Sequence, residues 1–337
     1  MEEMQIKELK NILSTPKKIV IIPHKNPDGD AIGSSLGLYH YLKHYQHEVH
    51  IIAPNEYPEF LKWMPGEDDI LKYEYQADAC NSIIQKAELV FTLDFNSLSR
   101  IDEVQNALKD FQGDYVMIDH HQAPEGYARF MYSNTAMSST CEMIYNFIDF
   151  LGDTDKITSE IATCLYTGIM TDTGSFRFPS TTSSTHRIVA NLIDKGAENA
   201  NIHNAIFDTN SIDKLHLLGC ALKNLVALPE YHTVYITLSR EELQQYNYKK
   251  GDTEGFVNYG LSLDGIKFAV IFIESVQEDL IKISLRSKGD FSVNEFSRAH
   301  FNGGGHTNAA GGRSELSLEE TTKKFEEILK DYKSQLQ

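Results

Sequence analysis

The chain has 337 residues and a formal net charge of −17, with 41% hydrophobic and 23% charged residues. A chain of this length and composition is expected to fold into two globular domains. The negative charge argues against binding of long nucleic acids, which requires many cationic side chains facing phosphates. It does not argue against hydrolysis of a short phosphate ester, because bound divalent cations can supply the positive charge.

No apolar run approaches the ~20 residues that span a bilayer. The amphipathic N-terminal segment also lacks the successive sections of a secretory signal. The four cysteines lie far apart, without a CxxC pair, which favours packing thiols in a reducing compartment: Cys80, Cys141, Cys164 and Cys220. These features predict a cytoplasmic protein without a membrane anchor.

The first part of the sequence alternates apolar, strand-like segments with helical segments. We expect strands over 17–23, 47–53, 87–95 and 114–121, and helices over 31–45, 139–151, 159–172 and 181–196. The last of these helices begins with hydroxyl residues and ends at Gly196, as helix caps do. Strands that alternate with helices form a mostly parallel sheet with both faces covered, so the sequence predicts an α/β fold.

The pattern changes after this first domain, which we place at 1–196. Residues 197–211 are polar and weakly periodic, and we interpret them as the connection to a second domain, 212–337. The second domain is expected to contain the following elements: helix 213–226, strand 232–239, a further helix, strands 267–275 and 280–287, a glycine-rich loop at 302–306 and a terminal helix over 318–332. This pattern predicts a smaller α/β domain with its own core.

Aspartates and histidines stand where predicted elements of the first domain end. They follow three strands and close one helix, in this order: His24, Asp28 and Asp30; Asp94; Asp119, His120 and His121; Asp172. Ligand sites of open α/β sheets form at the carboxyl ends of the strands. Five aspartates gathered there would repel one another unless cations bind between them. Mixed carboxylate and imidazole ligands suit Mn²⁺, with Mg²⁺, Co²⁺ or Zn²⁺ as alternatives, and two such ions promote phosphoryl displacement.

Each of these residues also has an ordinary structural explanation. An aspartate at a strand end often caps a helix or forms a turn, and a pair of histidines is often a surface feature. The DGD segment at 28–30 occurs in calcium loops, but the other ligands of such a loop are absent from this sequence. Only the joint pattern of four segments indicates a metal site.

Several motifs of the sequence resemble those of a known family. HKNPDGDAIGS, LDFNSLSR, DHH and TDTGSFRF, in that order, resemble the four motifs of the DHH phosphoesterase superfamily. LRSKG followed by NGGGHTNAAGG resembles the DHHA1 domain. Within the superfamily the chain is most similar to the stand-alone bifunctional oligoribonucleases and pAp phosphatases, the NrnA-type nanoRNases. The resemblance covers essentially the whole chain and implies a catalytic domain at 1–196 and a substrate-binding domain at 212–337.

The resemblance also implies roles for individual residues of the first domain. Family members hold two metal ions, whose matching ligands are His24, Asp28 and Asp94 for one ion and Asp30, Asp94, His120 and Asp172 for the other. Asp94 would therefore bridge the two ions. Asp119 would orient ligands through hydrogen bonds, and His121 would face the scissile phosphate. Arg100 would support the phosphate or the geometry of the metal site.

In the second domain, three consecutive glycines allow backbone N–H groups to approach a phosphate. With the histidine after them they match the substrate-binding GGGH of the family: Gly303, Gly304, Gly305 and His306. Arg286 suits bidentate phosphate binding and, with Lys288, matches the place where the family binds the phosphate end of its substrate. Arg313 is a weaker candidate that could equally be a solvated charge. Asn302 replaces a further family glycine, and asparagine tolerates the left-handed backbone expected there.

We therefore expect a two-metal phosphoesterase that hydrolyses short single-stranded oligonucleotides, linear dinucleotides such as pApA, and pAp, with domain closure as a gating step. Exopolyphosphatase, pyrophosphatase and cyclic-dinucleotide phosphodiesterase activities of the same superfamily stay open. An inactive nucleotide-binding sensor is a further alternative, although no matched metal ligand is missing. The sequence determines neither the cleavage polarity nor the oligomeric state, for which a homodimer is one option.

Overall fold

The structure, a computed structural model, describes residues 3–276 and 278–337. It contains two compact units, one extending to Thr209 and the other beginning at Asn210. None of the helices among the described residues is both long and apolar enough to cross a membrane.

The first unit is built on a parallel sheet with the strand order β3-β2-β1-β4-β5-β6. Its strands are β1 (Lys18–Pro23), β2 (Glu48–Ala53), β3 (Ile70–Lys72), β4 (Leu89–Leu93), β5 (Asp114–Asp119) and β6 (Phe130–Ser133). The chain moves outward from β1 to β3 and then returns to the other side of β1. The carboxyl ends of β1 and β4 thus lie at the point where the strand order reverses, where open α/β sheets bind ligands.

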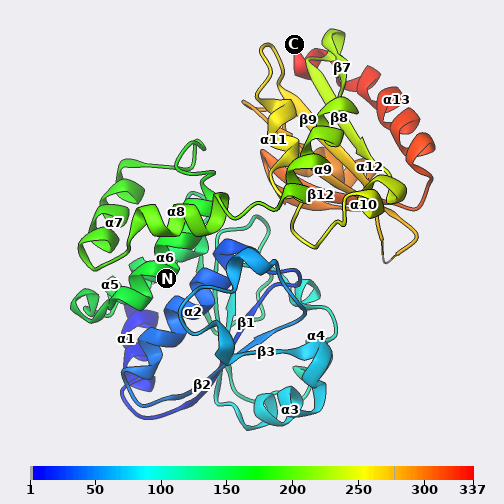
Figure 1. The fold of residues 1–337 in the computed structure, drawn as a ribbon. Coiled ribbons are helices and arrows are strands. Elements are labelled where there is room, and N and C mark those ends of the chain that lie inside the picture. Colours follow the sequence, from blue (N-terminus) through cyan, green and yellow to red (C-terminus); the bar gives the residue numbers. More distant parts are fainter. Residues whose placement is uncertain (1–2, 277) are drawn as a thin grey trace. The chain divides into compact units, whose positions relative to one another are not determined.

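Helices cover both faces of this sheet (Figure 1). They are α1 (Glu3–Ile12), α2 (Gly29–Lys43), α3 (Tyr73–Lys86), α4 (Val104–Ala107), α5 (Thr140–Phe150), α6 (Ser159–Asp172), α7 (Ser183–Asp194) and α8 (Asn199–Phe207). Ile19 and Ile21 of β1 face the core that α2, α5 and α6 share. Val20 and Ile22 face the opposite core, which α3 and α4 cover. Burial on both faces explains why the strands are continuous apolar runs.

The segment that we predicted to be the connection, 197–211, is mostly helical. Residues 199–207 form α8, whose Ile202 and Ile206 are buried in the core of the first unit. The boundary between the units falls later, after Thr209. The apolar residues are spaced four apart in an otherwise polar segment, which is enough to pack one narrow face of a helix. The connection is therefore shorter than the sequence suggested.

The second unit contains a mixed sheet with the order β11-β12-β10-β9-β8-β7, in which only β8 and β9 pair in parallel. Its strands are β7 (Val226–Leu228), β8 (Thr233–Leu238), β9 (Phe268–Glu274), β10 (Ile281–Ser287), β11 (Gly304–His306) and β12 (Ala309–Ser314). Its helices are α9 (Ile212–Lys223), α10 (Arg240–Gln245), α11 (Phe256–Leu261), α12 (Val293–His300) and α13 (Leu318–Leu336). One core lies beneath α12 and α13, and the other beneath α9 and α11.

Candidate metal centre

Two strand ends at the reversal point of the first sheet supply the middle of the site. His24 follows β1 directly, and Asp94 follows β4, the neighbouring strand. Both residues are buried. Asp94 adopts a left-handed backbone angle, φ 64°, while its amide still donates to the carbonyl oxygen of Ile118 at 3.1 Å. This uncommon conformation turns the chain sharply out of the strand and places the carboxylate at the sheet edge.

The ring orientation of two histidines is fixed by carbonyl groups. The Nδ1 atom of His24 lies 2.8 Å from the carbonyl oxygen of Lys25, and Nδ1 of His120 lies 3.2 Å from that of Met137. A carbonyl oxygen only accepts, so each Nδ1 must carry the proton in these contacts. In the neutral ring each Nε2 then offers a lone pair, which is how metal-binding histidines are held.

The carboxylate of Asp94 lies between these two lone pairs. Its Oδ2 is 3.5 Å from Nε2 of His24, and its Oδ1 is 3.5 Å from Nε2 of His120. The hydroxyl of Thr140 donates to the same Oδ1 at 2.9 Å. Because each oxygen faces a different histidine, the geometry suits a carboxylate that is shared between two cations.

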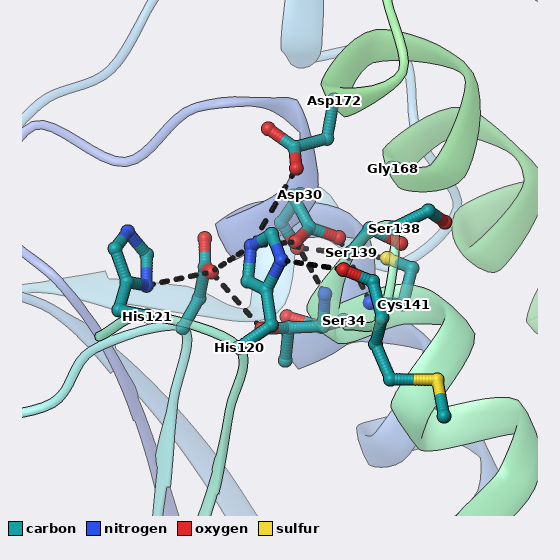
Figure 2. Close-up of polar contacts among 12 residues, drawn as sticks. Asp30, Ser34, His120, His121, Ser138, Ser139, Cys141, Gly168 and Asp172 are labelled. Carbon is teal, nitrogen blue, oxygen red and sulfur yellow. Dashed lines mark hydrogen bonds and ion pairs between the residues drawn. The ribbon is translucent and has the colours of Figure 1, made fainter. Parts of the chain in front are cut away.

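The remaining predicted ligands complete two groups around Asp94. His24, Asp28 and Asp94 form one group, and a second consists of Asp30, His120 and Asp172; within each, one ligand atom per residue lies within 4.8 Å of the others. Figure 2 shows His120 facing the carboxylates of Asp30 and Asp172, whose oxygens lie 3.7 and 3.5 Å from its Nε2. The structure therefore brings all the predicted ligands together.

The donor set fits divalent cations. Hydrogen bonds between charged groups are about 2.7–2.9 Å long, and the contacts of Nε2 of His24 and His120 with the carboxylates are 3.5–3.9 Å. Ligand atoms at about 2.0–2.2 Å from one ion are separated by roughly 3.0–3.5 Å. The spacing thus matches atoms that surround an ion better than atoms that share a proton.

A helix N-terminus holds Asp30 in this arrangement. The amides of Thr140 and Cys141, the first residues of α5, donate to its two carboxylate oxygens at 2.6 and 2.8 Å. Free N–H groups and the helix dipole both favour an anion at this position. Asp28 has a related role, because its Oδ1 caps α2 by accepting from the amides of Asp30 and Ala31 at 3.0 and 3.1 Å.

Asp119 and His121 form a pair beside the site. Oδ1 of Asp119 accepts from Nδ1 of His121 at 2.7 Å, so the carboxylate fixes the histidine ring. Asp119 is fully buried, and among the described residues its Oδ2 has no hydrogen-bond partner. Together with Asp94 these residues form a further group within 4.8 Å. The predicted orienting role of Asp119 agrees with its hydrogen bond to His121, and its Oδ2 is a further possible ligand atom.

Burial and mutual repulsion shift the pKa values across the site. Burial, with the charges of Asp94 and Asp172, raises the pKa of Asp30 well above its usual range. Burial also raises the pKa of Asp172, to about 6. It would raise the pKa of Asp94 too, but the facing His120 and His24 hold that pKa well below its usual range. Burial lowers the pKa of His120, yet the facing aspartates raise it well above its usual value. Without a cation, protons must balance this cluster.

Arg100 lies outside the ligand groups. It belongs to the short 3₁₀ helix Leu98–Ile101, and its side chain is exposed. Its carbonyl oxygen accepts from the amide of Lys25 at 2.8 Å, which joins the loops after β1 and β4. Burial lowers the pKa of His24, contacts with Asp94 and Asp28 raise it above its usual value, and the charge of Arg100 opposes the rise. Arg100 thus contributes to the site through its backbone, which joins the two loops, and the sequence did not reveal this contact.

In the second unit, the predicted phosphate-binding residues stand on neighbouring strands. Arg286 of β10 lies opposite Ala309 of β12, which lies opposite His306 of β11. The guanidinium of Arg286 donates to the carbonyl oxygen of Leu285 at 3.0 Å. Lys288 follows β10 and is exposed. Strand register thus aligns Arg286 with His306 across a small residue.

The glycine run is an edge strand and not the irregular loop that we expected. Gly304–His306 forms β11, and a side chain at Gly303 would collide with the carbonyl oxygen of Gly311, 1.9 Å from the added Cβ. The amide of Gly305 donates to the side chain of Asn294 at 3.0 Å. Asn302 adopts φ 47°, the left-handed conformation predicted for it. The glycines therefore permit close strand packing, and anion binding by them stays a prediction.

Sequence reasoning missed the residues that position Asp30 and Asp94. Thr140 and Cys141 bind these carboxylates mainly through the N-terminus of α5, and a signal for that terminus was present. Ser139 caps α5 by accepting from the amide of Glu142 at 3.0 Å, and Ser-x-x-Glu before an apolar run is typical of a helix start. The pattern locates the helix, but only the fold shows which anion it faces.

Fold and site together define a class: an α/β protein of two units with a carboxylate–imidazole cluster that could hold metal ions, placed where the strand order of the parallel sheet reverses. Comparison with known proteins agrees. The model of the DHH family, N-terminal domain, matches residues 18–169, and that of the DHHA1 domain matches residues 230–337. Two curated relatives are each a bifunctional oligoribonuclease and PAP phosphatase NrnA. The one from Thermus thermophilus is 32% identical (87% of this chain, 83% of the relative). The one from Bacillus subtilis is 29% identical (90% and 91%).

A solved structure is also similar over nearly the whole chain. It is an exopolyphosphatase-related protein from Bacteroides fragilis, 41% identical, with a TM-score of 0.95 and coverage of 99% of this chain and 98% of that one. The chain belongs to the DHH family, with a DHHA1 domain in its second unit. The resemblance that the sequence motifs indicated is confirmed.

Proposed function

We propose that the protein is a metal-dependent phosphoesterase that hydrolyses short oligonucleotides, including dinucleotides such as pApA, and pAp to mononucleotides. The observation that carries the proposal is the position of Asp94, whose two carboxylate oxygens face His24 and His120 at 3.5 Å each. A carboxylate shared in this way is typical of two-metal hydrolases. The substrates are those for which the two NrnA relatives are named.

The residues of the first unit would hold two divalent cations, and we propose Mn²⁺. When bound, such ions lower the pKa of a water molecule and neutralise charge on the phosphate. The protein's own contribution is to fix the ligands, because α5 holds Asp30 and carbonyl groups orient His24 and His120. Asp119 fixes the ring of His121, with Nε2 directed away from the carboxylate. We assign to His121 the contact with the scissile phosphate or proton transfer to its leaving group.

Substrate recognition is assigned to the second unit. Arg286 and Lys288 are the cations proposed to bind the phosphate end of the substrate, together with the Gly303–His306 segment. The part-buried position of Arg286 in β10 supports this assignment, because strand pairing on both sides holds its backbone rigidly. A guanidinium on a rigid strand suits bidentate phosphate binding. A cytoplasmic location and a homodimer are further proposals from the sequence alone.

A panel of substrates tests the proposed function. Purified protein with Mn²⁺ is incubated with pApA, a trinucleotide, pAp, a cyclic dinucleotide, pyrophosphate and polyphosphate, and products are separated by anion-exchange chromatography. We expect mononucleotides from pApA and the trinucleotide, AMP and phosphate from pAp, and slower turnover of the others. Absence of hydrolysis of all the nucleotide substrates would overturn the proposal.

Polyphosphate hydrolysis is a second candidate function. The observation that favours it is the similarity, 41% in sequence with a TM-score of 0.95, to a protein described as exopolyphosphatase-related. Both reactions displace a phosphoryl oxygen and would use the same metal centre. The polyphosphate arm of the panel separates them, because a polyphosphatase would release orthophosphate from that substrate faster than it cleaves pApA.

A further inference from the structure

In the sheet of the second unit, the face of β10 and β12 that is turned away from α13 is covered only in part, by α11 next to β10. In β10, Ile283 and Leu285 are buried in the core beneath α13. Because side chains alternate along a strand, Lys282, Ser284 and Arg286 belong to the opposite face. All three are exposed or part-buried, whereas their neighbours in the strand are fully buried. This face of β10 therefore carries two cations and a hydroxyl.

The adjoining strand continues this face. Ala310 of β12 is buried in the same core, so Gly311 and Arg313 share the face of β12 that is turned away from it. Gly311 lies directly opposite Ser284. A Cβ added to Gly311 would meet only the carbonyl oxygen of Ile283, at 3.8 Å. Around Gly311 this surface is thus a floor of exposed strand backbone.

Two cationic side chains lie side by side at one end of this floor. Lys282 lies directly opposite Arg313 in the antiparallel ladder, and both are exposed. Within the part of the chain that the structure describes, neither forms an ion pair. Like charges at directly opposite positions destabilise a sheet, and the chain as a whole carries −17. A cationic pair that repels across the sheet, in a chain otherwise dominated by acidic residues, points to an anionic ligand.

The distance along β10 relates this pair to the proposed phosphate site. Lys282 and Arg286 are four residues apart, which corresponds to about 14 Å at the rise of a strand. Along one strand of double-helical DNA, nucleotides are about 3.4 Å apart on the helix axis, and we take this spacing for a stacked short oligonucleotide. The pair therefore lies roughly four nucleotides from Arg286. The side chains on this face of β10 and β12 include no carboxylate that would repel phosphates.

We propose that this face, from Arg286 to the Lys282–Arg313 pair, binds the distal phosphates of a short oligonucleotide. It would add affinity for substrates of four or five nucleotides, whereas pAp and dinucleotides are too short to reach the pair. The inference rests on the proposed function and deepens it, because it names the part of the molecule that senses substrate length. The proposed ligand is a short oligonucleotide, because its phosphates follow one another at intervals, as the cations do along β10 and β12.

Binding measurements test this inference separately from catalysis. Fluorescently labelled, phosphorothioate-linked penta-adenylate and di-adenylate, which resist hydrolysis, are titrated with the Mn²⁺-loaded protein at several salt concentrations. For Lys282→Gln/Arg313→Gln we expect the affinity for the pentanucleotide to fall about fivefold to twentyfold. Its log–log salt slope should fall by about 1.4, the value for two lost contacts with a single strand. The affinity for the dinucleotide should change less than twofold.

Two further variants make the result specific. Gly311→Val leaves the charge unchanged, and its Cβ would meet only the carbonyl oxygen of Ile283, at 3.8 Å. Because its side chain would occupy the floor, this variant should also weaken pentanucleotide binding selectively. Lys323→Gln/Lys330→Gln removes two exposed cations from α13, which covers the opposite face of the sheet. This variant should not change the affinity for either oligonucleotide. Equal losses for both ligands, or an unchanged salt slope in the Lys282/Arg313 variant, would overturn the inference. Failure of the hydrolysis panel would instead overturn the proposed function.

Discussion

Asp94 differs from the other acidic residues of the centre in both geometry and backbone. Each of its oxygens faces a different histidine, and its own φ of 64° is uncommon for a residue with a side chain. Uncommon backbone conformations persist where the surrounding structure holds them, often at functional sites. Here two strands and the amide contact with Ile118 hold it. We therefore expect that few residues could replace Asp94 without losing either the left-handed backbone or the two oxygens that face the histidines.

Asp94→Asn tests that position through activity. Asparagine has nearly the same size and tolerates the left-handed backbone, but it cannot offer two anionic oxygens. Loss of a group that only orients a ligand costs about 10- to 100-fold, so loss of the shared ligand should lower kcat/KM for pApA by more than about 100-fold. Asp110→Asn, an exposed aspartate, serves as the control. Activity within tenfold of wild type in the Asp94 variant would contradict the shared-ligand assignment.

Asp172 gives a prediction about stability and pH. Its pKa of about 6 lies above the value of about 3.9 in an unfolded chain. The ionised form of Asp172 is thus disfavoured in the folded, metal-free protein. The free energy of unfolding therefore decreases as the pH rises from about 4 through 6. Asp172→Asn removes this cost. We expect the metal-free variant to be more stable than wild type at pH 8 by about 1–3 kcal/mol, and equally stable near pH 4.

Urea unfolding of both proteins in the presence of EDTA measures this difference. The same variant should gain less stability from added Mn²⁺ than wild type does, because one proposed ligand is missing. A variant that is less stable than wild type at pH 8 without metal would show that Asp172 makes a favourable interaction beyond the repulsion described above.

The helices that carry the ligands are held together by very close packing. A Cβ added to Gly33 of α2 would lie 2.6 Å from the carbonyl oxygen of Cys164 in α6. One added to Gly168 of α6 would lie 2.1 Å from Sγ of Cys141 and 2.9 Å from Oδ1 of Asp30. The approach of α2 to α6 brings Asp30 near Asp172, at the end of α6 (Figure 2). Glycine is thus required here for close approach of two backbones.

Gly168→Ala should therefore disturb both the fold and the site. The added methyl group must displace Cys141 or the Asp30 carboxylate, and overpacking of this kind costs about 1–3 kcal/mol. We expect lower stability in urea and weaker Mn²⁺ binding. Gly219→Ala in α9 is the matched control, because nothing lies within 4 Å of the added Cβ and alanine favours a helix over glycine by about 1 kcal/mol. A Gly168 variant as stable as wild type would contradict the packing described.

Much of the first unit could be predicted from its sequence. The apolar strands place His24, Asp94 and His120 correctly, because a parallel sheet buried on both faces leaves little freedom in strand identity. The comparisons confirm the family, the α/β class and the phosphoesterase class. The short strands β3 and β6 were not predicted. Three or four residues carry too little periodicity to reveal a strand.

Other features depend on contacts between distant segments. The amides of Thr140 and Cys141 serve Asp30, 110 residues earlier in the chain, and no local pattern encodes that pairing. The NGGGH segment resembled an irregular loop because its glycines have no side chains to indicate a strand. Its pairing with β12 depends on partners across the sheet. Sequence patterns thus locate the helices and strands well. Which distant residue each of them contacts becomes clear only from the fold.

In the first unit as a whole, we expect protons and metal ions to compete for the same cluster of carboxylates and imidazoles. The pKa values of Asp30 and His120 are raised well above their usual ranges, so the metal-free cluster holds its protons more strongly, and a bound cation must displace them. Apparent affinity for Mn²⁺ should therefore rise by about tenfold or more between pH 5.5 and pH 7.5. Isothermal titration calorimetry in buffers of different ionisation enthalpy measures both the affinity and the protons released. An affinity that is equal at both pH values would contradict this linkage.

The number of Mn²⁺ ions bound per chain tests the metal centre most directly. Wild-type protein and Asp94→Asn are dialysed to equilibrium against Mn²⁺, and bound metal is measured by mass spectrometry of the acid-digested samples. We expect two ions per chain in wild type and at most one in the Asp94 variant. A wild-type protein that binds a single ion or none, or a variant that retains both, would contradict a two-metal centre built around Asp94.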